Sequence, residues 1–143
     1  MADVKVKILK IEPGKGAVIS LFDQRVQAGF PSPVQAVAPD TIDLTAELVN
    51  DPSSTFCARV IGDSMIGEGI NEGDLLIIDR QLEPHDGCIA VCSIDGDFTV
   101  KRLQINHDGI YLRPANRRYR PIKVSTLSDF IIWGVVSHII HRL

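Results

Sequence analysis

Short runs rich in valine and isoleucine occupy the chain from Thr55 to its end, and they constrain the fold more than any other feature. These runs are FCARVIG, DLLIIDR, CIAVCSI, DFTVKRLQI, IYLRP, RPIKV and FIIWGVVSHIIHRL. Turn-forming segments separate them, namely Glu72-Gly73-Asp74, Asp86-Gly87, Asp95-Gly96-Asp97 and Asn106-His107-Asp108-Gly109. β-Branched runs at this spacing with Asp-Gly turns are typical of antiparallel sheets and barrels. The pattern predicts a mainly β domain, and CSIDGDFTVKRL is its clearest hairpin.

The first part of the chain carries a different pattern. Val4, Val6 and Ile8 alternate with lysines, which predicts a short strand. The rest of residues 1–28 mixes apolar and polar residues and predicts a flexible arm that is too short to fold alone. Residues 29–39 contain three prolines, which exclude a helix and favour an extended linker.

Residues 40–50 offer the best short helix. Asp40 or Thr41 is the expected N-cap, and Pro52 ends the segment. The expected organisation is therefore an arm over residues 1–28, an extended linker over 29–39, and a single β domain over 40–143. A chain of 143 residues is long enough to bury one core.

Charge and composition narrow the classes of partner. The formal net charge is −3, whereas a chain that binds nucleic acid through phosphates usually has a basic stripe. We expect the one dense basic cluster to be a solvated loop beside a turn. It consists of Arg113, Arg117, Arg118, Arg120 and Lys123. Three cysteines without a disulfide framework favour a reducing, cytoplasmic setting, and no apolar stretch reaches the roughly 18–20 residues of a membrane span.

Ser64 is the candidate nucleophile. It follows the apolar run Val60-Ile61 and then Gly62-Asp63, where glycine permits a sharp turn. Such a turn can direct the hydroxyl and nearby backbone N–H groups at one point. Taken alone the pattern is weak, because a serine after Gly-Asp more often caps a turn. A serine nucleophile also needs a base, and no histidine is convincingly placed for that role among His85, His107, His138 and His141.

Lys101 is the alternative base. Period-2 alternation in the predicted strand places it on the same face as Thr99 and Leu103. A lysine in an apolar environment loses the water that stabilises its charged form, and a neutral amine can act as a general base. Taken alone, an ordinary exposed strand lysine is the commoner interpretation.

Together the two motifs resemble the S24 family of self-cleaving serine peptidases, which includes LexA-type repressors and the UmuD group. GDSM and FTVKRL place the serine and the lysine 37 residues apart. Further segments match in order: VQAGFPSP (26–33), DPSSTF (51–56), GDLLIIDR (73–80), DGDFTVKRL (95–103), LRPAN (112–116) and FIIWGVVSHII (130–140). The similarity extends from about residue 18 to the end. It implies the LexA/UmuD-like, β-clip-like fold of antiparallel strands, and the short N-terminal arm resembles the UmuD group.

The resemblance implies that the chain cuts itself at Ala28–Gly29. Ser64 would attack the carbonyl of Ala28, and neutral Lys101 would accept the serine proton and later protonate the leaving amine of Gly29. Backbone N–H groups of Asp63 and Ser64 would stabilise the oxyanion. A substrate in the same polypeptide, or in a dimer mate, has a high effective concentration, so a general substrate pocket is unnecessary.

The resemblance also implies partners. A RecA filament on single-stranded DNA would stimulate cleavage, as part of the SOS response. The trimmed chain, residues 29–143, would form a homodimer and join a UmuC-like polymerase as a subunit of the translesion DNA polymerase V. No cofactor, no metal, no membrane and no sequence-specific contact with DNA are implied.

Three other functions stay open. A non-cleaving module with the S24 fold would dock a partner without cutting, although the presence of both Ser64 and Lys101 favours the enzyme. A signal-peptidase-like enzyme shares the Ser/Lys dyad but would need a membrane anchor. A LexA-type or phage-type repressor would carry a helix-turn-helix domain, which residues 1–28 do not hold.

Several other side chains have simpler expected roles. Cys88 and Cys92 are four residues apart on an apolar run, so they share a face and are predicted to be small core residues. Trp133 is expected in the core or at a dimer interface. Asp79 and Arg80 end their strand, where a structural ion pair or a turn is expected. A metal site at the His138/His141 pair would lack a third ligand.

Overall fold

The computed structural model describes residues 5–11, 18–21, 40–62, 65–113, 120–127 and 129–143. Contacts within the chain divide it into two compact units. The larger unit combines Met1–Ile11 with Asp51–Leu143, and the smaller unit is Glu12–Asn50. The candidate base, Lys101, belongs to the larger unit.

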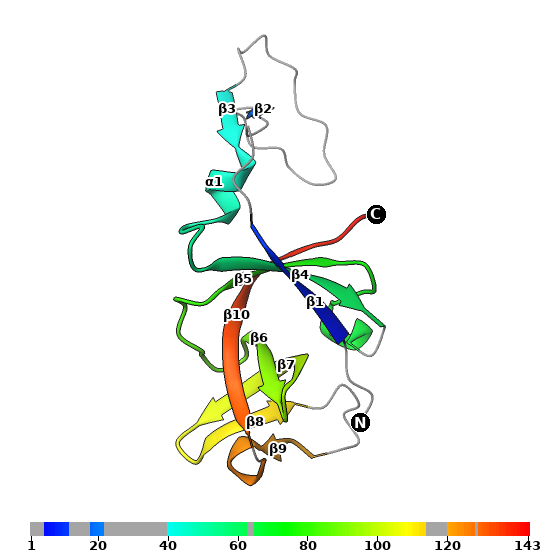
Figure 1. The fold of residues 1–143 in the computed structure, drawn as a ribbon, viewed down its shortest axis with the longest axis vertical. Helices are drawn as coiled ribbons and strands as arrows, with labels where there is room; N and C mark the ends of the chain where they lie inside the picture. Colours follow the sequence, from blue (N-terminus) through cyan, green and yellow to red (C-terminus); the bar gives the residue numbers. More distant parts are fainter. Residues whose placement is uncertain (1–4, 12–17, 22–39, 63–64, 114–119, 128) are drawn as a thin grey trace, which may run out of the picture. The chain divides into compact units, whose positions relative to one another are not determined.

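The larger unit is built on one eight-stranded antiparallel sheet (Figure 1). The order of strands across the sheet is β1-β4-β5-β10-β6-β7-β8-β9. The strands are β1 (Lys5–Lys10), β4 (Thr55–Ile61), β5 (Leu75–Asp79), β6 (Ile89–Ile94), β7 (Asp97–Asn106), β8 (Gly109–Arg113), β9 (Ile122–Lys123) and β10 (Phe130–Ile140). Two 3-10 turns, η1 (Ile66–Glu68) and η2 (Val124–Thr126), join them. Every run predicted as a strand from Thr55 onward therefore forms one, which confirms the mainly β prediction.

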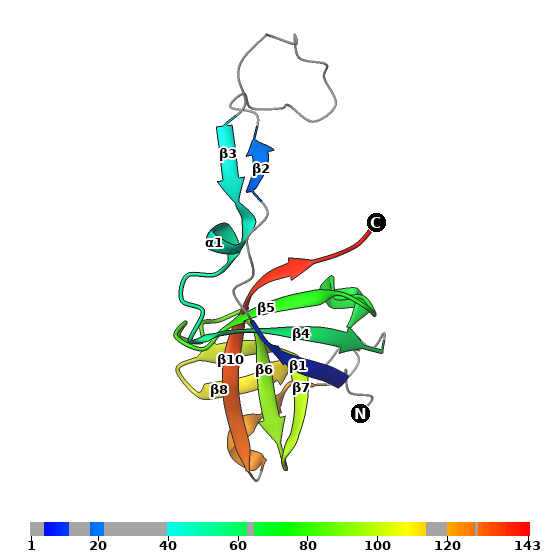
Figure 2. The ribbon, with the colours of Figure 1, turned by 45° about the horizontal axis from the view of Figure 1, so that its top comes forward.

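The long strand β10 joins the two halves of this sheet. Its first half pairs with β6 and its second half pairs with β5, and Figure 2 shows it bending between them. The register shifts between Ile132 and Gly134 and again between Val136 and His138, and such bulges bend a strand. Gly134 is required at the first bend, because a Cβ there would lie 2.5 Å from Cγ2 of Ile78.

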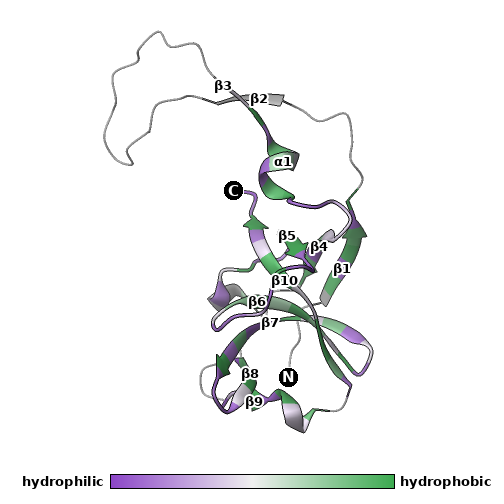
Figure 3. Cartoon of the chain, turned by 90° about the vertical axis from the view of Figure 1, so that its left-hand side faces the viewer, coloured by the Kyte–Doolittle hydropathy of each residue, from purple (hydrophilic) through white to green (hydrophobic). Residues whose placement is uncertain are grey.

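Two hydrophobic clusters lie on opposite faces of β6 and β7. Along β6, Ile89 and Val91 belong to the first cluster, whereas Ala90 and Cys92 belong to the second. The first cluster also contains Ala58, Val60, Met65, Ile70, Leu76, Ile78 and Val100, and the second also contains Cys88, Leu103, Leu112 and Val135. Burial on both faces explains why residues 88–92, CIAVC, are all apolar instead of alternating with polar residues. Figure 3 shows hydrophobic colouring along these strands and hydrophilic colouring at the connections.

The β6–β7 hairpin forms as predicted, with Asp95 and Gly96 at its tip. Ile94 pairs with Asp97 across the turn. Both tip residues have positive φ, 51° for Asp95 and 86° for Gly96. Two consecutive positive φ angles match the twist of the flanking strands, and Asp-Gly tolerates them well. The turn fixes the register of β7 and therefore the face on which Lys101 lies.

The smaller unit corrects the predicted helix over residues 40–50. Residues Asp40–Asp43 form strand β3, which pairs with β2 (Val18–Leu21), and helix α1 begins only at Leu44 and ends at Leu48. Asp43 is its N-cap, instead of Asp40 or Thr41, and accepts hydrogen bonds from the N–H groups of Thr45 and Ala46. The strand partner is about twenty residues away in the chain, so the local capping pattern could not reveal it.

The strand predicted from the alternation in residues 4–8 is confirmed as β1. It pairs with β4 from Lys5↔Ile61 to Lys10↔Phe56. A cleavable arm ending at residue 28 stays a prediction, as does the linker over 29–39, which lies outside the described residues. Contacts nevertheless group Met1–Ile11 with the β domain, because β1 is a strand of the main sheet. The second segment of that unit begins at Asp51.

Candidate active site

Lys101 lies in the middle of β7 and is 3% exposed. Thr99 and Leu103 share its face, as predicted, and both are buried. Ala90 of β6 lies directly opposite it. The interpretation of Lys101 as an ordinary exposed strand lysine is therefore wrong, because the second hydrophobic cluster lies on its face of the sheet.

Two polar groups share this buried face with Lys101. Cys92 lies opposite Thr99 in the β6–β7 pair. Burial raises the pKa of the Cys92 thiol to about 12, and Cys88 adds to the rise while the charge of Lys101 opposes it. Thr99 Oγ1 is buried and has no hydrogen-bond partner within the described part of the chain. The face of the sheet that carries Lys101 is therefore mostly apolar, and the amine of Lys101 is its most polar group.

The segment that leads to Ser64 contains a glycine in a left-handed backbone conformation. Gly62 directly follows β4 and has a φ of 98°, a conformation that favours glycine. The N–H of Gly73 donates to the carbonyl of Val60, and the N–H of Val60 donates to the carbonyl of Asp74. Met65 is buried in the first cluster, and η1 follows it. The predicted nucleophile Ser64 and oxyanion donor Asp63 lie outside the described residues, as do Ala28 and Gly29.

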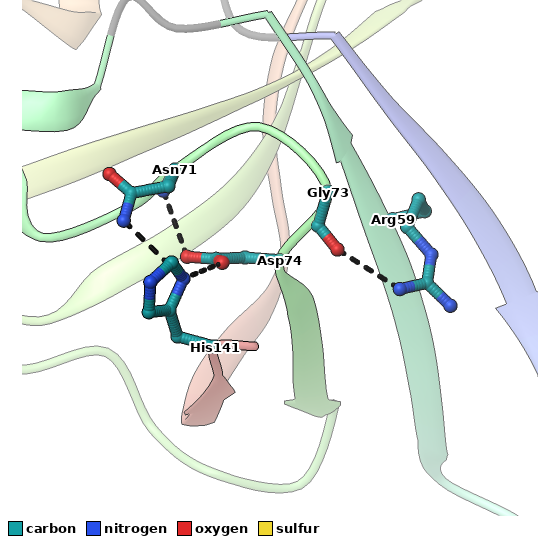
Figure 4. A network of polar contacts seen from close by, with 5 residues as sticks. All are labelled: Arg59, Asn71, Gly73, Asp74 and His141. Carbon is teal, nitrogen blue, oxygen red and sulfur yellow. Dashed lines mark hydrogen bonds and ion pairs between the residues drawn. The ribbon is translucent and has the colours of Figure 1, made fainter. Parts of the chain in front are cut away.

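A buried carboxylate anchors the start of β5 close to this turn (Figure 4). Asp74 is 2% exposed, and its Oδ2 accepts a hydrogen bond from the N–H of Asn71 at 2.8 Å. Its Oδ1 lies 2.6 Å from Nδ1 of His141, beyond the end of β10. Sequence reasoning missed this pair because the two residues are 67 positions apart. The paired arrangement gives His141 a structural partner.

Glu68 of η1 forms a second polar link, to the strand that carries Lys101. Its Oε2 accepts a hydrogen bond from Nε of Arg102 at 2.5 Å, and its Oε1 lies 3.4 Å from Nε of Arg113. Arg102 and Arg113 are directly opposite each other in β7 and β8. Like charges in that position destabilise a sheet, so the carboxylate between them offsets their repulsion.

Arg113 therefore departs from the solvated loop expected of the basic cluster. Within that cluster, Arg120 is exposed and Lys123 is partly buried, with its ammonium 5.8 Å from the ring of Tyr111. Arg117 and Arg118 lie outside the described residues. The cluster thus contains Arg113, which has an ion-pair partner in η1, and Arg120, which is exposed.

The other side chains that the sequence analysis singled out pack in the core or hold a turn. Cys88 and Cys92 are buried core residues, which confirms their prediction. Trp133 packs against the first cluster, with Phe56 and Phe98 edge-on to it and the Arg80 guanidinium 4.6 Å from its ring. Asp79 accepts a hydrogen bond from the N–H of Gln81, which holds the turn after β5.

Among the described residues, no group of three or more histidine, cysteine, aspartate or glutamate side chains is arranged to hold a metal ion. His85 and His107 are exposed, and His138 contacts the hydroxyl of Ser137. Across the same part of the chain, no helix is long and apolar enough to cross a membrane.

Several known proteins are similar to most of this chain. The Peptidase S24-like family matches residues 19–137. Protein SamA of Salmonella typhimurium is 41% identical over 122 residues, which cover 85% of this chain and 84% of SamA. Protein ImpA of Escherichia coli is 42% identical over 128 residues, covering 85% of this chain and 83% of ImpA. The LexA repressor of Anaeromyxobacter dehalogenans is 40% identical over 134 residues, covering 92% of this chain and 58% of the repressor. The chain belongs to the Peptidase S24-like family.

Proposed function

We propose that this chain is a self-cleaving serine peptidase in which Ser64 is the nucleophile, Lys101 is the general base and the Ala28–Gly29 bond is the substrate. The observation that carries the proposal is the burial of Lys101 in the middle of β7. Strand lysines normally extend into water, and burying one is costly. A buried lysine inside the stretch that matches a peptidase family is best explained by a role in the chemistry.

The proposed reaction proceeds through an acyl-enzyme. The Oγ of Ser64 bonds to the carbonyl carbon of Ala28, and its proton passes to the neutral amine of Lys101. The bond between Ala28 and Gly29 then breaks, and Lys101 protonates the leaving amine of Gly29. Water, deprotonated by the same amine, hydrolyses the ester at Ala28 and regenerates the serine.

The backbone around the nucleophile supports an oxyanion site. Gly62, with its positive φ, and the 3-10 turn η1 flank Asp63 and Ser64 in the chain. A sharp turn can bring successive N–H groups together, and preorganised N–H donors stabilise the developing oxyanion. We assign this role to the backbone N–H groups of Asp63 and Ser64.

The substrate is tethered in this proposal. Residues 12–50, which include Ala28 and Gly29, leave the larger unit after β1 and return to it at Asp51. Tethering at both ends raises the effective concentration of the bond at the catalytic groups. The chain therefore needs no recognition pocket for free peptides.

The biological setting in the proposal follows the UmuD-like and LexA-like members of the family. A RecA filament on single-stranded DNA stimulates the cleavage after DNA damage. Residues 29–143 then form a homodimer that binds a UmuC-like polymerase and supports translesion synthesis as a subunit of DNA polymerase V. The high identity to SamA and ImpA over most of each chain supports this setting.

Matched substitutions test the assignment of the dyad. Lys101→Met keeps the length of the side chain and removes the base, and Ser64→Ala removes the nucleophile. Both variants should melt within a few degrees of the wild type and show no cleavage. Lys123→Met and Ser125→Ala are the controls, because Lys123 is only partly buried and Ser125 is exposed. Cleavage at the wild-type rate in either dyad variant would refute the assignment.

The pH dependence gives an independent check. Self-cleavage without a RecA filament should accelerate as pH rises, because only the neutral amine of Lys101 accepts the serine proton. Equal rates at neutral and alkaline pH, in protein that stays folded, would exclude lysine as the base. An intact chain under both conditions, and also with the activated filament, would favour the non-cleaving binding module.

A further inference from the structure

The N-terminal strand β1 covers an edge of the main sheet. It is the first strand in the sheet order, and β4 is its neighbour. Their antiparallel register joins Lys5 to Ile61 at one end and Lys10 to Phe56 at the other. Without β1, the backbone N–H and C=O groups of β4 that face it would lose their partners.

Apolar contacts hold β1 in place. Val6 lies opposite Val60, and Ile8 lies opposite Ala58. Both Val6 and Ile8 pack against the first hydrophobic cluster, which contains Val60 and Ala58. The other face of β1 carries Lys7, which is exposed. Val6, Ile8 and the backbone hydrogen bonds of the strand pair therefore all contribute to the docking of β1.

One pair in the same register opposes docking. Lys7 lies directly opposite Arg59, and both are exposed. The Arg59 guanidinium donates a hydrogen bond to the carbonyl of Gly73 and so stays close to β4 (Figure 4). Like charges directly opposite each other weaken a strand pair. Apolar contacts of Val6 and Ile8 thus hold β1 on β4, whereas the repulsion between Lys7 and Arg59 weakens the pairing. This combination suits a strand that can be released.

The covalent connection of β1 runs through the proposed cleavage site. β1 ends at Lys10, and the next strand of the main sheet begins at Thr55, so cleavage after residue 28 separates β1 from β4. Pairing that was intramolecular then becomes binding between two molecules, so the fraction of β4 edges that are occupied depends on concentration.

We propose that the edge of β4 is a strand-docking site whose occupant is the Lys5–Lys10 segment of this chain, and that cleavage at residue 28 makes this occupant exchangeable. The inference rests on the proposed cleavage for its trigger. In the intact chain, β1 is a lysine-rich outer strand, and such strands discourage edge-to-edge association. In the cut chain, β4 presents an edge that accepts an extended strand, either the released fragment or the same segment of a second copy.

The test measures retention of the fragment spanning residues 1–28. The cut protein is passed through size exclusion at micromolar concentration and again after serial dilution, and intact mass identifies the species in each peak. We expect the fragment to co-elute with residues 29–143 when concentrated and to separate on dilution. If wild-type protein does not cut itself, a specific protease site replacing residues 27–30 makes the same break, so failure of cleavage and failure of docking are distinguished.

Two neighbouring substitutions should act in opposite directions. Ile8→Asp removes the apolar contact and should weaken retention at least about tenfold. Lys7→Glu replaces the repulsion with an attraction to Arg59 and should strengthen retention a few-fold at low salt, with the gain fading at high salt. In the intact chain, Ile8→Asp should also speed hydrogen exchange of β4 amides, whereas Lys7→Glu should slow it.

The proposal is overturned by either of two results. The first is complete separation of the wild-type fragment at the highest concentration, as complete as with Ile8→Asp. The second is equal retention in wild type, Ile8→Asp and Lys7→Glu, which would mean that the β1–β4 register does not hold the fragment.

Discussion

Ala90 lies directly opposite Lys101 in the β6–β7 pair. Both residues are buried, since Ala90 is 0% exposed and Lys101 is 3% exposed. A small residue opposite the lysine leaves room for its long side chain within the second hydrophobic cluster. A larger residue at position 90 would therefore compete with Lys101 for the same space.

Ala90→Val should damage cleavage more than it damages the fold. Two added methyl groups should cost about 1–3 kcal/mol through overpacking and displace the Lys101 side chain. Ala58→Val is the matched control, because Ala58 is equally buried but belongs to the other cluster. Denaturant unfolding should show similar losses in the two variants, and only Ala90→Val should slow self-cleavage at a temperature where both are folded. Equal slowing would contradict the expected crowding.

Gly134→Ala should destabilise the sheet where β10 bends. The new Cβ would lie 2.5 Å from Cγ2 of Ile78, so we expect a loss of about 1–3 kcal/mol in the free energy of unfolding. Ile78→Leu removes that methyl branch and should recover part of the loss when combined with Gly134→Ala. Gly67→Ala is the control, since nothing lies within 4 Å of a Cβ built there. Additive losses in the Gly134/Ile78 pair would show that the predicted clash does not occur.

Cys92 should make stability fall at alkaline pH. Burial raises the pKa of its thiol from 9.0 in the unfolded chain to about 12 in the folded one. Between these values the folded state holds a proton that the unfolded state has released, so stability present below pH 9 declines as pH rises toward 12. The decline contributed by this group should be about 1.4 kcal/mol per pH unit.

The comparison that isolates this effect is wild type against Cys92→Ala. Urea unfolding at several pH values above 9 should show a steeper loss for the wild type, because lysines and tyrosines that also titrate there are common to both proteins. Parallel curves for the two proteins would mean that water reaches the thiol in the folded state.

Glu68 and Arg102 should be energetically coupled. Their side chains are 10% and 24% exposed, so we expect Glu68→Ala to cost about 1–2 kcal/mol. A double-mutant cycle with Arg102→Ala should give a coupling of roughly 1 kcal/mol. Because Glu68 follows Ser64 by four residues and Arg102 is next to Lys101, the same variants should slow self-cleavage. Zero coupling would show that the ion pair does not fasten η1 to β7.

Much of the β domain could be predicted from sequence because its strands carry local signals. Period-2 alternation placed Thr99, Lys101 and Leu103 on one face, and the Asp95-Gly96 turn fixed their register. The boundary of α1 could not be predicted, since β2 supplies a distant strand partner for residues 40–43. Residues within a few positions of one another determine turns and faces, whereas pairing between distant strands depends on the whole fold.

The candidate site also has some features that local sequence patterns predict and others that depend on distant residues. The face of Lys101 follows from alternation, but its burial does not, because Leu112 and Val135 of other strands complete the cluster on that face. The Asp74–His141 pair joins residues with no local relation. The roles of Ser64 and of the Ala28–Gly29 bond rest on the motif and on family membership, and they stay predictions.

The most direct test of the central claim is intact-mass spectrometry of the full chain incubated at alkaline pH and, separately, with a RecA filament on single-stranded DNA. The account predicts two fragments, one ending at Ala28 and one beginning at Gly29, and neither in Ser64→Ala. An uncut wild-type chain under both conditions, or a cut at any other bond, would contradict it.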